Sequence, residues 1–229
     1  MENYKPDFLR GIKLFSSLNE EELCVISSKV VLKEFRKNET IFHEEETNTY
    51  MYIIVFGKVK VVRTDKSGKE TIFAMHQSGD FFGEMSLIDG KTTPASVIAT
   101  EESLIGIISK ENFHLLLLTQ EKILDQLLEV LCSRVRESWR RIQMLNSKYA
   151  SQRIKMLFLM LSERYGVKTS DGMTLDIALT HQDIADMAGL TRESATRVID
   201  KWLKDGEISI LKNKVIHLSP EFLQTGLRK

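Results

Sequence analysis

Two arginines and a glutamate near the C-terminus are spaced so that they share one side of a helix. They lie in the segment GLTRESATR, residues 189–197, and each residue of an α-helix advances about 100° around its axis. Arg192, Glu193 and Arg197 therefore fall within one arc. Arginine can donate two hydrogen bonds to guanine O6 and N7, and glutamate can accept one from cytosine N4. The arc is a candidate for reading DNA bases, whereas on an isolated helix it would more simply be a solvated charged face.

The surrounding residues predict two helices joined by a tight turn, and this context favours base reading. Thr180 followed by Asp183 is close to a capping box and predicts where the first helix begins. Gly189 ends that helix, and Thr191 is placed to cap the second one. This is the spacing of a helix-turn-helix, in which the second helix enters the major groove with its N-terminal residues at the base edges. A separate apolar stripe is left to pack, formed by Ala195, Val198, Ile199 and Trp202.

Other polar residues of this region are candidates for contacts with the DNA backbone. Thr180, Gln182 and Thr191 lie at or near the two helix N-termini, which suit phosphate binding, although each could serve only as a cap. Thr196 shares the side of the second helix that carries the three charged residues. Two short strands expected after residue 207 are consistent with a wing.

The N-terminal half predicts an all-β roll or barrel. After a short helical start, the stretch from about residue 30 to residue 108 is rich in β-branched and aromatic residues and is interrupted by glycines. Short strands recur at intervals of about ten residues, which is typical of all-β barrels and rolls. The clearest strands are expected at 52–55, 59–62, 71–73 and 96–99.

Residues 110 to 148 predict one long helix with a dimer seam. Its seam residues are spaced alternately four and three apart, which is a heptad pattern. The seam comprises Leu124, Leu128, Leu131, Val135, Ser138, Ile142, Leu145 and Tyr149. Its one polar member, Ser138, either fixes the register of the two helices or faces a bound molecule. A second apolar helix around residues 154–161 follows and breaks at Tyr165-Gly166.

Composition narrows the class of protein. The 229 residues fit one large or two ordinary domains, and the formal net charge of zero means that DNA binding has to rest on local charge. The chain has neither a leader-like start nor an apolar run of about 20 residues, which predicts a cytoplasmic location and no membrane segment. Cys24 and Cys132 are too few for an iron–sulfur cluster with four thiolates, and we expect both to be core residues.

Taken in order, these parts resemble a known family along nearly the whole chain. The segment SGDFFGEMSL, residues 78–87, is similar to the phosphate-binding cassette of bacterial transcription regulators of the Crp/Fnr superfamily, and residues 185–197 are similar to their helix-turn-helix. The resemblance implies an α+β chain with a cyclic-nucleotide-binding-type β-roll (jelly roll) at 1–118. A dimerisation helix and hinge at 119–148 and a winged helix-turn-helix at 149–229 would follow.

The resemblance also implies partners and a mode of control. It implies a homodimer that binds double-stranded DNA and is regulated allosterically by a small effector in the roll. Arg192, Glu193 and Arg197 match the cyclic AMP receptor branch of the superfamily, which implies a TGTGA half-site followed by its inverse, TCACA, about one helical turn away. The Glu-x-x-Ser-Arg arrangement of the fumarate–nitrate branch is absent. The loop from Tyr165 to Met173 corresponds to the surface with which the family contacts RNA polymerase.

The effector site only partly matches the family pattern. Gly83 and Glu84 match the pair that holds the ribose, and Met85 and Ser86 belong to the same cassette. Thr93 and Pro94, however, stand where the family has the Arg-Ser pair that holds the cyclic phosphate. Loss of such a charge-assisted hydrogen bond costs about 1.5–3 kcal/mol.

The long helix completes the predicted effector site. Ser138 aligns with the first of two base-contacting hydroxyls, whereas Trp139 replaces the second and either stacks on a flat ligand or fills the pocket. The effector is therefore left open between cyclic AMP, another small molecule, no effector at all, and haem. For haem the roll offers His43, His76 and His114, none at a characteristic ligand spacing.

The sequence offers little support for other classes of function. We find no nucleophile elbow, no HExxH and no paired carboxylates with metal-ligand spacing, so we expect neither an enzyme nor a metal site. The main alternative is a cyclic-nucleotide-binding interaction module that does not touch DNA, for which the zero net charge is the argument; a haem-based gas sensor is a further one.

Overall fold

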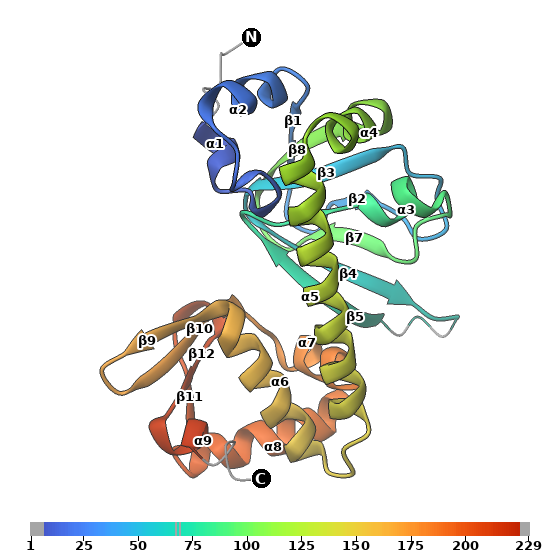
Figure 1. Cartoon of the computed structure of the whole chain (residues 1–229). Helices are drawn as coiled ribbons and strands as arrows, with labels where there is room; N and C mark the ends of the chain where they lie inside the picture. Colours follow the sequence, from blue (N-terminus) through green and yellow to red (C-terminus); the bar gives the residue numbers. More distant parts are fainter. Residues whose placement is uncertain (1–6, 67, 69, 225–229) are drawn as a thin grey trace. The chain divides into compact units, whose positions relative to one another are not determined.

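The computed structural model describes residues 7–66, 68 and 70–224, apart from the side chains of Asp7 and Asn213. The chain forms two compact units, residues 1–134 and 135–229, which divide inside helix α5 (Glu121–Leu145). The predicted α+β fold, with a β-roll, a long helix and a C-terminal helix-turn-helix, is confirmed (Figure 1). No helix among the described residues is both long enough and apolar enough to cross a membrane.

The first unit is built on two antiparallel four-stranded sheets. It contains the four strands that the sequence predicts at 52–55, 59–62, 71–73 and 96–99. One sheet has the order β1 (Val31–Phe35), β8 (Ser103–Ser109), β3 (Tyr50–Phe56), β6 (Phe81–Phe82). The other has the order β2 (Thr40–Phe42), β7 (Ser96–Ala99), β4 (Lys58–Thr64), β5 (Glu70–Gln77). Phe42, Tyr52 and Val97 come from both sheets and pack in one hydrophobic cluster between the sheets.

Helices cover the other face of the sheet that contains β3. Because strand side chains alternate between faces, Tyr52 and Ile54 point into the roll while Met51 and Ile53 point to the helices. The N-terminal helices are α1 (Asp7–Arg10), η1 (Lys13–Phe15) and α2 (Glu20–Ser27), and α3 (Glu84–Asp89) follows β6. Strand β3 is therefore buried on both faces.

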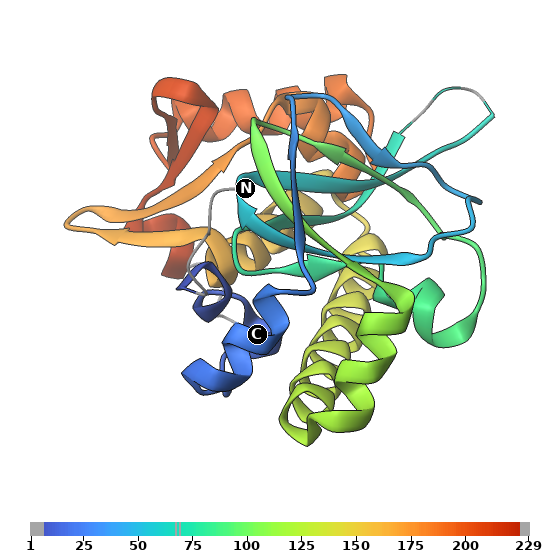
Figure 2. The ribbon, with the colours of Figure 1, turned by 90° about the horizontal axis from the view of Figure 1, so that it is seen from above.

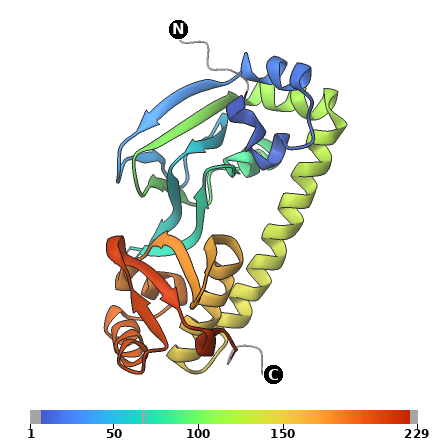
Figure 3. The ribbon, with the colours of Figure 1, turned by 90° about the vertical axis from the view of Figure 1, so that its left-hand side faces the viewer.

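The prediction of a single long helix at 110–148 is wrong in one respect, because this stretch forms two helices. α4 (Lys110–Thr119) ends at Gln120, whose φ of −131° and ψ of 90° are not helical, and α5 begins at Glu121. The break lets Phe113 of α4 and Ile123 of α5 pack into the same core. From Glu121 onward α5 is one continuous helix (Figure 3).

The second unit is a helical domain with a small sheet. Its helices are α6 (Ala150–Tyr165), α7 (His181–Ala188), α8 (Arg192–Lys204) and α9 (Pro220–Gln224), with the turn η2 (Lys212–Lys214). Its sheet has the order β11 (Ile208–Ile210), β12 (Val215–Leu218), β10 (Gly172–Ala178), β9 (Gly166–Thr169). The two strands expected after residue 207 and the end of α6 at Tyr165 are confirmed. The stretch expected as a loop from Tyr165 to Met173 instead contains β9 and the start of β10, whose hairpin projects from the unit (Figure 2).

The expectation that both cysteines are core residues is wrong, because Cys24 and Cys132 are exposed. On α2, Leu23 and Ile26 are the residues that point into the core, and the advance of about 100° carries Cys24 away from them. On α5, Ile123 and Leu127 set the buried face in the same way, and Cys132 lies outside it.

Candidate nucleic-acid interface and effector site

The two helices of the helix-turn-helix begin and end where the sequence predicts. Thr180 Oγ1 accepts a hydrogen bond from Asp183 N (3.0 Å), and Asp183 Oδ2 accepts one from Thr180 N (2.8 Å), which completes the capping box. α7 ends at Gly189, whose φ of 63° is left-handed and favours glycine. Thr191 Oγ1 then accepts from Ser194 N (3.3 Å) and caps α8. Local capping therefore fixes the turn.

Packing of α8 leaves the predicted base-reading arc in solvent. Ala195, Ile199 and Trp202 are buried, and the Trp202 ring meets Phe222 edge to face at 5.1 Å between centroids. The residues of the arc, Arg192, Glu193 and Arg197, are exposed. The apolar stripe that the sequence predicts is therefore the side of α8 that packs, although Val198 is only half-buried. The charged side faces solvent.

The charge of Glu193 is reinforced by its neighbours. Hydrogen bonds from its own backbone N–H and from the Thr191 hydroxyl, followed by the charges of Arg192 and Arg197, lower the pKa of Glu193 below its ordinary value. Glu193 is therefore ionised at neutral pH and can only accept hydrogen bonds. This is the state that a cytosine amino group requires.

Two of the residues predicted to contact DNA are hydrogen-bonded within the domain. Gln182 Nε2 donates to Asp186 Oδ1 (2.8 Å), and Thr196 Oγ1 lies 3.0 Å from His181 Nδ1. His181 thereby links the first turn of α7 to the middle of α8. Contacts of Gln182 and Thr196 with DNA stay predictions.

A basic hollow beside α8 was missed by the reading of the sequence. It has a volume of about 510 Å³ and is lined by Ala150 and Ser151 from the first turn of α6 and by Arg197 and Lys201 from α8. The N-cap residue of α6, Tyr149, makes no side-chain cap hydrogen bond. A helix N-terminus next to two cations suits a phosphate. The spacing of Arg197 and Lys201, one helical turn apart, was the available signal.

In the roll, the cassette turns sharply at Gly83. Its φ of 86° is left-handed, and a Cβ atom there would lie 2.9 Å from Tyr50 O and 2.9 Å from the Tyr52 ring. Asn48 Nδ2 donates to Gly83 O (3.1 Å) and to Tyr50 O (2.6 Å). Only glycine fits this position without strain.

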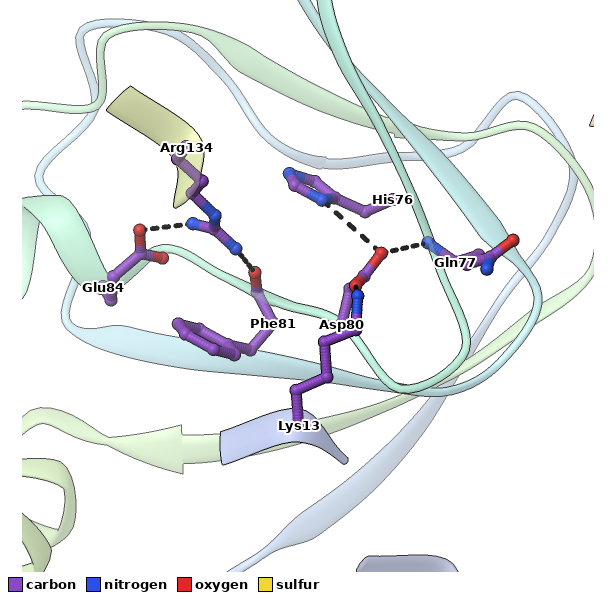
Figure 4. A network of polar contacts seen from close by, with 7 residues as sticks. All are labelled: Lys13, His76, Gln77, Asp80, Phe81, Glu84 and Arg134. Atoms are coloured by element: carbon purple, nitrogen blue, oxygen red, sulfur yellow. Dashed lines mark hydrogen bonds and ion pairs between the residues drawn. The ribbon is translucent and has the colours of Figure 1, made fainter. Parts of the chain in front are cut away.

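Glu84, the candidate for holding a ribose, is 1% exposed and paired with Arg134 of α5 (Figure 4). Arg134 Nη1 lies 2.6 Å from Glu84 Oε1, and its other terminal nitrogen donates to Phe81 O. Glu84 Oε2 is buried without a hydrogen-bond partner among the described residues. Arg134 was given no role from the sequence, because it lies off the heptad seam.

A second polar cluster ties the cassette to the N-terminal segment (Figure 4). Asp80 is 3% exposed, and its carboxylate accepts hydrogen bonds from Lys13 Nζ (2.8 Å) and Gln77 N (2.9 Å). His76 Nδ1 lies 3.7 Å from it, and the His76 ring is stacked on Phe82. His114, another haem candidate, is bonded to Leu87 O at 3.0 Å. These imidazoles are engaged by the protein, while His43 contributes its backbone to the loop described next.

Thr93, which stands in place of the family's phosphate-binding arginine, is held by the loop after β2. It is 2% exposed, its hydroxyl donates to His43 O (2.6 Å), and it accepts from Glu46 N (3.2 Å). Its hydroxyl is thus satisfied internally. Of the other cassette residues Met85 is exposed and Ser86 is buried.

Ser138 and Trp139 lie on the exposed side of α5, in the second unit. The structure does not test whether they contact an effector, so their assignment stays a prediction.

Comparisons with known proteins agree with this arrangement. A sequence model of the cyclic nucleotide-binding domain matches residues 32–120, and one of the Crp-like helix-turn-helix domain matches residues 152–225. The chain is 30% identical to the cAMP-activated global transcriptional regulator CRP of Pasteurella multocida, over 81% of this chain and 88% of that protein. It is 26% identical to the cyclic AMP receptor protein of Thermus thermophilus, over 88% and 90%. The structure of FixK2 from Bradyrhizobium japonicum shares the fold, with a TM-score of 0.75 at 21% identity, over 87% of this chain and 98% of that one.

Proposed function

Because the chain belongs to the Crp/Fnr family of transcription regulators, we propose that it binds an inverted repeat of the type TGTGA followed by TCACA. The observation that carries this proposal is the arc of α8, where Arg192, Glu193 and Arg197 are exposed while three of the four residues of the apolar stripe are buried. In this proposal the two arginines each read a guanine, and Glu193 accepts from the cytosine of a neighbouring pair.

Backbone contacts set the register of this reading. We assign them to the two helix N-termini at Thr180 and Thr191 and to the basic hollow formed by Ser151, Arg197 and Lys201. Arg197 belongs to the base-reading arc and also lines the hollow, so base reading and phosphate binding are assigned to adjoining parts of α8.

The exposed seam of α5 supports a homodimer. Leu128, Val135, Ile142 and Leu145 are all exposed in the single chain, although they are apolar and regularly spaced. A heptad stripe of this kind is buried when it meets a second copy. Two copies would present two α8 helices to two half-sites, in agreement with the inverted repeat.

The roll is proposed as the effector domain, with Glu84 as the residue that recognises the ligand. Its buried Oε2, which has no hydrogen-bond partner in the described part of the chain, can accept a hydrogen bond from a ligand hydroxyl, such as that of a ribose. The phosphate side of the site is different, because the Thr93 hydroxyl is already satisfied and carries no charge. Cyclic AMP and another hydroxylated small molecule are both consistent with these features.

We propose that the protein acts on cytoplasmic DNA without catalysis and contacts RNA polymerase through the β9–β10 hairpin.

Fluorescence anisotropy tests the proposal. The purified protein is titrated onto a labelled TGTGA/TCACA duplex and onto a scrambled duplex at one fixed salt concentration, with and without cyclic AMP. Preference for the palindrome supports the proposed function, and dependence on cyclic AMP identifies the effector. Equal binding to both duplexes in every condition would refute it.

A further inference from the structure

A cleft in the first unit, separate from the cassette, combines cations with an apolar wall. Its volume is about 470 Å³, which lies within the range of small-molecule sites. The lining comes from Lys29, from strands β1, β2, β3 and β8 and from the start of α4, and none of it comes from residues 78–93. The cleft is therefore a different site from the one proposed for the effector at Glu84.

The charges of this cleft have one sign. Lys29 and Lys33 line it, and no lining residue is acidic. Neither lysine forms an ion pair with any residue in the part of the chain that the structure describes. Lys33 Nζ lies 4.6 Å from the centroid of the Phe35 ring, so this cation is held over an aromatic surface at the cleft. A ligand that brings a negative charge would meet two lysines that no described carboxylate neutralises.

The apolar part of the lining suits a flat or branched body. Phe35, Tyr50 and Tyr52 present rings, and Ile107 adds an aliphatic side chain. Asn112 and Ser109 supply a few polar groups at the edge. Mostly apolar walls with a few converging polar groups are typical of small-molecule sites.

We propose that this cleft binds a small organic anion with an aromatic or branched apolar body, whose anionic group pairs with Lys29 and Lys33. The occupant would also contact residues that hold the cassette in place. Tyr52 stacks on Phe82 with 5.1 Å between ring centroids, and Asn48 bonds to Tyr50 O and to Gly83 O. The cleft is therefore connected to Gly83 through the hydrogen bonds that Asn48 donates to Tyr50 O and to Gly83 O.

The probe for this proposal is 1-anilinonaphthalene-8-sulfonate, an aromatic anion whose fluorescence rises on binding. The full-length protein is compared with the double variant Lys29→Gln/Lys33→Gln and with a matched control, Lys37→Gln/Lys91→Gln, which removes the same charge elsewhere on the roll. We expect about a tenfold loss of affinity in the first variant, since each partly exposed pair contributes modestly, and no loss in the control. N-phenyl-1-naphthylamine, which lacks the sulfonate, should bind all three proteins alike.

Equal sulfonate affinity in all three proteins, or an equal loss in both variants, would overturn the proposal. Hydrogen–deuterium exchange locates the site: slower exchange in residues 29–35 and 50–53 on adding the probe supports it, whereas protection confined to the α5 seam contradicts it. If a peptide of aspartates and glutamates protects the cleft and the probe does not, the cleft belongs to a protein partner instead. No DNA is present in these assays, so their outcome is independent of the proposed function.

Discussion

Removing Arg134 should destabilise the roll far more than removing its partner does. The Glu84 side chain is 1% exposed, whereas the Arg134 side chain is 29% exposed. Water can therefore reach Arg134 when its partner is removed, but it cannot reach Glu84. Arg134→Met strands a buried carboxylate, and breaking a buried pair in this way costs about 3–5 kcal/mol. Glu84→Gln leaves a partly hydrated guanidinium beside an amide that can still accept a hydrogen bond, which costs about 1–2 kcal/mol. The double variant Glu84→Gln/Arg134→Met should lie within about 1 kcal/mol of the Glu84→Gln variant, because no stranded charge remains.

The assay has to report on the roll rather than on the whole chain. Trp139 and Trp202 both belong to the second unit, so tryptophan fluorescence does not follow the unfolding of the first. Hydrogen exchange of the amides of β3 and β8, measured at increasing urea concentration, gives the free energy of opening of the roll. A cost of less than about 1 kcal/mol for Arg134→Met, or a larger cost for Glu84→Gln, would refute the reasoning.

Three further predictions follow from the structure. Gly83→Ala should destabilise the roll by about 1–3 kcal/mol more than the control Gly90→Ala in the same exchange assay, because both glycines have positive φ but only Gly83 lacks room for a Cβ atom; equal costs would count against the close approach. Burial raises the pKa of Tyr52 to about 12. Its contribution to stability is therefore complete below pH 10 and is lost as the pH rises towards 12, so Tyr52→Phe should gain about 1–2 kcal/mol relative to wild type across that window in urea unfolding; parallel curves would show that Tyr52 is not the titrating group. Val135→Glu should convert the dimer to a monomer in sedimentation analysis while Arg136→Gln does not, because Val135 lies on the seam and is 50% exposed in the single chain; a Val135→Glu dimer would contradict the seam.

Local sequence signals were sufficient for the helix-turn-helix. Each of its caps is formed by residues no more than four positions apart: the capping box of Thr180 and Asp183, the left-handed end at Gly189, and the cap at Thr191. Helical periodicity likewise separated the buried stripe of α8 from its exposed arc. These features depend on neighbours in the chain, which is why a single sequence shows them.

Features that depend on distant residues were not predictable in this way. The helix break at Gln120 has neither glycine nor proline to mark it, and the residues that pack into one core on either side of it, Phe113 and Ile123, are ten positions apart. The pair of Glu84 and Arg134 joins residues far apart in the chain. The β9–β10 hairpin does leave a signal in the sequence, the alternation of apolar Met173, Leu175 and Ile177 with polar residues, but most of this alternation lies beyond the loop expected to end at Met173.

The central claim is that the exposed arc of α8 reads bases, and Arg192→Ala tests it most directly. Binding is measured on the TGTGA/TCACA duplex and on duplexes changed at each guanine of the half-site, at two salt concentrations, with Lys201→Ala as the backbone-contact control. We expect Arg192→Ala to lose about 1–3 kcal/mol of binding free energy on the intact site and almost nothing on the duplex in which the guanine that Arg192 reads is changed. Lys201→Ala should instead weaken binding to all duplexes alike and lower the salt dependence. If Arg192→Ala also weakens every duplex alike, Arg192 contacts phosphate and the proposed reading of the site is wrong.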